Sequence, residues 1–131
     1  MGAWGEAAFD NDDAADWVAE LDGASDATLI HAALLVAHSD YLEAPEGSIA
    51  LAASEVVAAA VGRGGPALPE AVGAWIEANR NSIGPDEVTL ALAAVDRVLA
   101  DGSELLELWA ETGEPTWNDG VQQLRSRLAL T

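Results

Sequence analysis

Residues 2–17 read GAWGEAAFDNDDAADW, and within this stretch the chain changes from an irregular arm to a helical pattern. The arm, residues 1–9, has Gly2 and Gly5 on either side of Trp4 and shows no helical repeat. We expect it to be extended, with Trp4 and Phe9 anchoring it on the core. Asp10 then has the residue type of a helix N-cap, because its carboxylate can accept a hydrogen bond from an unpaired backbone N–H.

The next residues carry the apolar stripe of a first helix that ends near Leu21. Its members follow the spacing i, i+3, i+4, i+7, and they are Ala14, Trp17, Val18 and Leu21. This spacing places all of them on one face, which we expect to be buried. Asp13 is expected to complete a capping box with Asp10, and Gly23 to end the helix in a left-handed conformation.

Further helices are predicted over about residues 25–38, 45–61, 69–80, 85–102, 103–109 and 116–128. Ser25, Ser103 and Thr116 are the expected caps of three of them. The second helix is apolar on nearly every side, so we expect it in the middle of the fold. The sequence therefore predicts an all-α fold, a single compact bundle of six or seven short helices over residues 1–131, with the N-terminal arm packed on it.

The charge of the chain is strongly negative, at −18, with 23 acidic residues, five arginines and no lysine. Residues 1–62 hold 12 of the acids and no arginine. Such a field opposes binding to nucleic acid or to an anionic membrane and favours encounter with a basic protein. Acidity can equally serve solubility alone. The chain lacks cysteine, and its apolar runs are too short to span a bilayer, so the cytoplasm is the expected location.

Three acids of the first helix, Asp12, Asp16 and Glu20, form like-charge pairs at i, i+4. We call them the acidic row. Each such pair destabilises an isolated helix by roughly 0.2–0.5 kcal/mol, so a cation is expected to compensate it. One source is internal, from among Arg80, Arg97, Arg125 and Arg127, and the other is a basic partner protein. The candidate binding residues are therefore the acidic row and its neighbour Asp13.

A second hypothesis is a metal-dependent or small-molecule-binding enzyme that uses the carboxylates of Asp10, Asp12, Asp13 and Asp16. Their spacing does not fit an EF-hand, which needs Gly at its sixth position and Glu at its twelfth. No catalytic residue, metal ligand or cofactor is assigned from the sequence. His31 and His38, seven residues apart on one helix, are too distant to share a metal ion, and we expect both at the core boundary with hydrogen-bond partners.

The opening also carries a sequence motif, composed of Met1, Gly2, Trp4, Gly5, Phe9, Asp10, Asn11 and Asp12. It resembles the opening of a bacterial family known as domain of unknown function 4259, from which Ala7 departs because the family often has glycine there. Residues 53–62, 68–75 and 98–109 are also similar to that family. The resemblance implies a small helical domain without an assigned activity. Small proteins similar to this family are associated with bacterial toxin-immunity sets, which implies an immunity or antitoxin role.

Together these features predict a non-enzymatic acidic domain that binds a basic protein. The expected structural residues of the opening are Trp4, Gly5, Phe9, Asp10, Asn11 and Trp17. The sequence makes no prediction about the oligomeric state.

Overall fold

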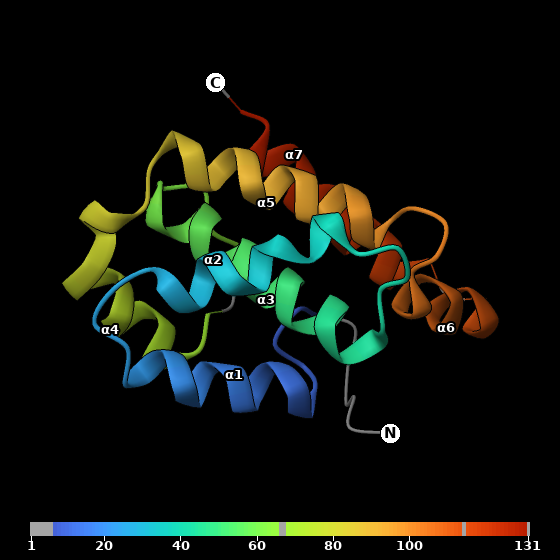
Figure 1. Cartoon of the computed structure of the whole chain (residues 1–131), viewed down its shortest axis with the longest axis horizontal. Helices are drawn as coiled ribbons and strands as arrows, with labels where there is room; N and C mark the ends of the chain where they lie inside the picture. Colours follow the sequence, from blue (N-terminus) through green and yellow to red (C-terminus); the bar gives the residue numbers. More distant parts are fainter. Residues whose placement is uncertain (1–6, 66–67, 114, 131) are drawn as a thin grey trace.

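The computed structural model describes residues 7–65, 68–113 and 115–130, and in this part the chain is all-α (Figure 1). Its elements are α1 (Asp12–Asp22), α2 (Thr28–Leu34), the 3-10 helix η1 (Leu35–His38), α3 (Ala44–Ala60), α4 (Glu70–Asn79), the 3-10 helix η2 (Arg80–Ser82), α5 (Pro85–Val98), α6 (Glu104–Thr112) and α7 (Thr116–Leu128). The expected fold class and the expected number of helices are confirmed for these residues.

Helix α3 lies at the centre of the fold and contacts α1, α2, α4, α5, α6 and α7 (Figure 1). Nearly all of its residues from Gly47 to Ala60 are buried, on every side of the helix. Most of them are Ala, Gly, Ser or Val, so neighbouring helices can approach the α3 backbone closely. The hydroxyl of Ser54, which is fully buried, donates to the Ala50 carbonyl oxygen at 2.8 Å.

The prediction that the second helix is central is wrong. Helix α2 is short, and the chain continues from it as η1, where the Leu35 side chain is 52% exposed. The apolar residues of this segment surround its axis, but only one side meets α3 and α5. Small residues on all sides, as in α3, allow a helix to be enclosed, whereas large apolar residues on all sides do not guarantee it.

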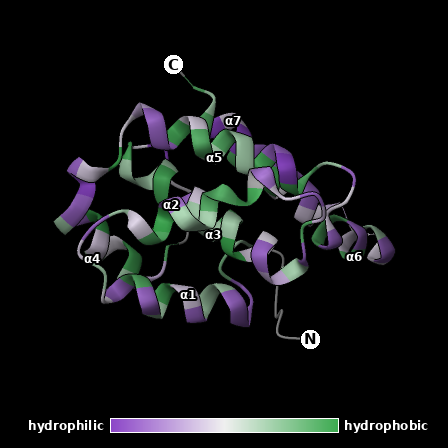
Figure 2. Cartoon of the chain, in the orientation of Figure 1, coloured by the Kyte–Doolittle hydropathy of each residue, from purple (hydrophilic) through white to green (hydrophobic). Residues whose placement is uncertain are grey.

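Helix α1 buries its predicted stripe of Ala14, Trp17, Val18 and Leu21 against α3 and α4. In Figure 2 its apolar residues alternate with strongly hydrophilic ones, as a two-faced helix requires. The expected left-handed end at Gly23 is wrong, because this residue has a φ of −92° and continues the right-handed turn.

The N-cap of α1 is Asn11 and not Asp10. The Asn11 side-chain oxygen accepts a hydrogen bond from the Ala14 N–H at 2.8 Å, and its amide nitrogen donates to the Ala8 carbonyl at 3.3 Å. An amide can make both bonds because it carries a donor and an acceptor, whereas an ionised carboxylate only accepts. With the cap at Asn11, Asp13 no longer stands three residues after it, so the expected capping box is wrong as well.

Two other caps differ from expectation and one agrees. Ser25 does not cap α2; the Asp26 carboxylate accepts from the Thr28 N–H at 3.0 Å instead. Thr116 lies inside the first turn of α7, after Pro115. Ser103 does cap α6, through a bond from the Leu106 N–H to its hydroxyl oxygen at 3.4 Å. Several Ser, Thr and Asp residues compete at each boundary, and the backbone path selects among them.

The loop before α3 and the turn before α6 are joined by Arg97. Its guanidinium donates to the carbonyl oxygens of Ser39, Asp40, Asp101 and Gly102 at distances from 2.9 to 3.2 Å. Gly102 has a φ of +82°, a conformation that L side chains rarely adopt. This turn ends α5 at Val98, earlier than predicted, while α6 continues to Thr112. No helix in the described residues is long and apolar enough to cross a membrane.

Candidate functional site

The acidic row lies on the solvent face of α1, opposite the buried stripe. Asp12, Asp16 and Glu20 are exposed, and so is the neighbouring Asp13. The row slants along the helix, because each step of four residues turns about 40° more than one full turn. Four carboxylates thus share one exposed surface.

The expected structural residues of the opening fall in two groups. Trp4 and Gly5 lie outside the described residues. Phe9 is partly buried and packs against the core, as predicted, and Trp17 is a core residue with 4% of its surface exposed. In the described part, the opening therefore serves packing and capping, through Phe9, Asn11 and Trp17.

No arginine compensates the acidic row within the described residues. Arg125 pairs with Asp96, and Arg127 pairs with Glu55. Arg97 is engaged with backbone carbonyls, as described above, and Arg63 donates to the Leu128 carbonyl oxygen at 3.2 Å. Arg80 is exposed on η2 and forms no ion pair with a described acid. The internal explanation for the row is therefore not supported by any of the four arginines proposed for it.

The hypothesis of a metal site at Asp10–Asp16 finds no matching geometry. In residues 7–65, 68–113 and 115–130, no group of three or more His, Asp or Glu side chains is placed to hold one metal ion. Asp10 precedes the helix, and Asp12 and Asp16 follow the outward face of α1, where side chains one turn apart extend into solvent. These carboxylates do not converge on a common point.

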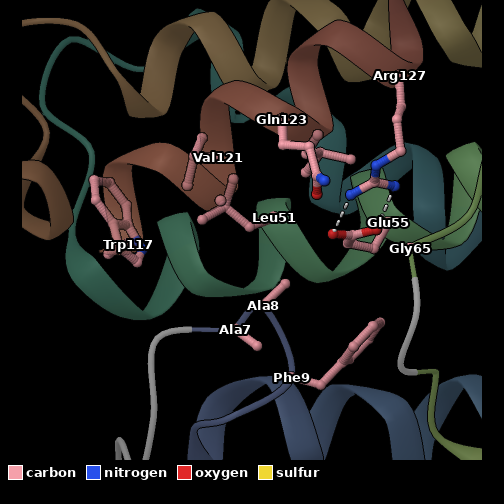
Figure 3. A pocket seen from close by; sticks show the side chains of 12 residues that line it. Ala7, Ala8, Phe9, Leu51, Glu55, Gly65, Trp117, Val121, Gln123 and Arg127 are labelled. Atoms are coloured by element: carbon pink, nitrogen blue, oxygen red, sulfur yellow. Dashed lines mark hydrogen bonds and ion pairs between the residues drawn. The ribbon is translucent and has the colours of Figure 1, made fainter. Parts of the chain in front are cut away.

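An apolar pocket of about 200 Å³ lies between α3, α7 and the segment before α1 (Figure 3). Figure 3 shows Ala7, Ala8 and Phe9 on the opposite side of the pocket from Val121 and Gln123. The pocket is smaller than the roughly 300–1,000 Å³ typical of small-molecule sites. Its apolar lining gives the segment before α1 a surface on which to pack.

One wall of this pocket holds the ion pair of Glu55 and Arg127, whose side chains are 15% and 16% exposed. The two terminal guanidinium nitrogens each donate to one carboxylate oxygen at 3.0 Å, and one of them also donates to the Arg63 carbonyl. Both charges are thus used within the protein. No sequence pattern indicated this pair, because its members are 72 residues apart and Arg127 fitted a simpler role at the end of its helix.

His31 is a boundary residue with a partner, as predicted. Its Nε2 lies 2.9 Å from Glu87 Oε2, with 46% of the histidine side chain and 14% of the glutamate side chain exposed. The other carboxylate oxygen of Glu87 accepts from the Gly84 N–H at 2.7 Å. Burial acts to raise the pKa of Glu87, but the hydrogen bonds from Gly84 and His31 outweigh it and hold the pKa below its usual value.

The same prediction is wrong for His38, which is exposed and does not lie at the core boundary. Among the described residues, neither Asp40 nor Glu43, which follow it closely in the sequence, forms an ion pair with it. Neither histidine belongs to a group of three or more His, Asp or Glu side chains that could hold a metal ion in the described part of the chain.

Comparison with known proteins places the chain in a family. A search of the curated proteins and a search of the solved structures each give no significant match. The profile of one family, described as "Domain of unknown function (DUF4259)", matches residues 2–120. Because this match includes all of the helices up to the first turn of α7, the resemblance drawn from the sequence is confirmed. The chain belongs to the DUF4259 family, whose members share a domain of unknown function.

Proposed function

We propose that this protein is a non-enzymatic domain that binds a basic protein through the acidic row of α1. One observation carries the proposal: Asp12, Asp16 and Glu20 are exposed at a mutually repulsive spacing, and no described arginine pairs with them. A basic partner would remove this repulsion, and the net charge of −18 would speed the encounter.

The narrower form of the proposal is an immunity or antitoxin role in the cytoplasm. The association of similar small proteins with toxin-immunity sets supports the role, and the absence of cysteine fits a reducing compartment. A toxin-like reading frame next to the gene would strengthen this form. A neighbourhood of unrelated metabolic genes would argue against it without affecting the binding proposal.

The test compares two variants of equal net charge in affinity capture from the native lysate. The row variant carries Asp12→Asn, Asp16→Asn and Glu20→Gln. The control carries Glu77→Gln, Asp101→Asn and Glu111→Gln, which replace three exposed acids of other elements. Both lose three negative charges, so a difference between them reports the position of the charge.

We expect a basic protein to be captured by the native chain and by the control, and to be lost from the row variant. Capture should also weaken as salt is raised, since exposed charges are screened. Circular dichroism checks that both variants remain helical. Equal capture of every protein by the two variants would show that the acidic row is not the binding surface.

A further inference from the structure

A second surface feature lies beside the acidic row, in a groove between α1, α2 with η1, and the start of α3. Its apolar walls are Trp17, Leu29, Ala33, Val36 and Ile49, and we call it the Trp17 groove. Figure 1 shows α2 and the first turns of α3 on the same side of α1. Its volume is about 240 Å³, below the roughly 300–1,000 Å³ of small-molecule pockets. This size suits one apolar side chain better than a separate ligand.

Glu46 lines the groove on the α3 side, and the helical spacing of α1 places further acids near Trp17. At 3.6 residues per turn, Asp13 lies about 40° and Glu20 about 60° from Trp17 around the α1 axis, so both are at the edge of α1 that carries Trp17. Asp16 follows at about 100°. On the other side, Glu46 in the first turn of α3 lines the groove and is exposed. An apolar hollow with acidic margins complements an apolar side chain flanked by cations.

The Trp17 indole supplies a separate observation. The side chain is 4% exposed, yet its Nε1 is buried without a hydrogen-bond partner in the described structure. By contrast, the Trp75 indole donates to the Ala24 carbonyl at 3.1 Å. Buried indole N–H groups usually have an acceptor, so this one is an unsatisfied donor in a residue that lines the groove.

From these observations we propose that the Trp17 groove binds an extended segment of the basic partner, in which one apolar residue enters the groove and neighbouring Lys or Arg residues pair with Asp13, Glu20 and Glu46. An extended backbone has free carbonyl oxygens, whereas a helix uses its own. The proposal requires the indole to turn toward the groove on binding, so that Trp17 donates to one of these carbonyls. This inference rests on the proposed function, because it assumes a basic partner.

Two synthetic peptides test it with the protein of residues 1–131. The first has a single Leu flanked on both sides by Lys and Arg, and the second has Ser in place of that Leu. Fluorescence anisotropy at physiological salt measures both affinities. Because the peptides have the same charge, the ratio of their affinities isolates the apolar contact. We expect the Leu peptide to bind at least roughly tenfold more tightly than the Ser peptide.

A groove-filling variant locates the contact. Ala32 is exposed and lines the groove, so Ala32→Leu should occupy it without disturbing the core. We expect this variant to bind both peptides equally. The matched control is Ala93→Leu on the exposed side of α5, which should keep the tenfold difference. In ¹⁵N NMR spectra, the Trp17 indole N–H signal, identified with Trp17→Phe, should shift when the Leu peptide is added.

The outcomes separate this inference from the proposed function. Equal affinity of the native protein for the two peptides would overturn the groove proposal. A difference between the two affinities that survives Ala32→Leu would also overturn it. Both conclusions hold even if the row variant weakens binding. The proposed function is decided by the capture experiment, because the row variant removes only Glu20 among the acids that this inference assigns to the peptide. Absence of binding by both peptides would overturn the groove and leave the result of the capture experiment standing.

Discussion

The Glu87 carboxylate connects two helices through its two oxygen atoms. One oxygen accepts from the Gly84 N–H at the start of α5, and the other contacts His31 on α2. The group is mostly buried, so its charge depends on these two partners. These two contacts of one carboxylate at a helix terminus have a direct consequence for the stability of the protein.

Glu87→Gln is expected to lower the free energy of unfolding at neutral pH, and the loss should shrink in acid. The folded pKa of Glu87 is lowered from the usual 4.5, so the charged form contributes stability above this value. The contribution disappears as pH falls through the folded pKa. Urea titrations of both proteins from pH 7 into acid measure the difference. Asp86→Asn, at the exposed neighbouring position, serves as the control. A difference independent of pH would contradict this account.

Helix α1 has one face that packs on the core and an opposite face that carries the proposed function. Its buried stripe joins it to the core, and its opposite face carries the acidic row. The Trp17 groove opens at the boundary between these faces. Because the faces are separate, charges of the row can be changed while the packing of α1 stays intact. The start of the helix depends on one side chain, that of Asn11.

Asn11→Ala should destabilise the protein by about 1 kcal/mol, within roughly 0.5–2 kcal/mol, because the Ala14 N–H loses its acceptor. Asp10→Ala should cost less than about 0.5 kcal/mol, since its side chain forms no cap. Chemical denaturation followed by circular dichroism measures both. If Asp10→Ala has the larger effect, the cap has been assigned to the wrong residue.

At the scale of the whole molecule, two features hold the bundle together around α3. The small side chains of α3 allow helices to pack on all of its sides, and the pair of Glu55 with Arg127 joins α3 to α7. The pair also contacts the chain after α3, through the Arg63 carbonyl. The arginines thus serve largely internal contacts, which leaves the outer surface strongly acidic.

Arg127→Met should lower the free energy of unfolding by about 2–4 kcal/mol, because it leaves the largely buried Glu55 carboxylate without its cation. The double variant with Glu55→Leu should recover part of this loss, since neither charge then remains. Denaturant unfolding of the native protein, both single variants and the double variant completes the cycle. Additive losses would mean that the two side chains do not interact.

The sequence alone determined the all-α class, the family, and most helices with the face that each one buries. It could do so because the stripes of α1, α4, α5 and α7 repeat with the helical period and need only local information. The outward position of the acidic row follows from the same period. It also indicated the Ser103 cap, where the choice of polar residues was narrow.

Only the tertiary structure decided which helix is central, which residue caps α1, where each arginine is engaged, and that a groove opens beside Trp17. Periodicity describes one helix at a time, whereas these features depend on which faces meet and how much volume their side chains fill. Glu55 and Arg127 show this most directly, since 72 residues separate them and α3 and α7 must pack before they can pair.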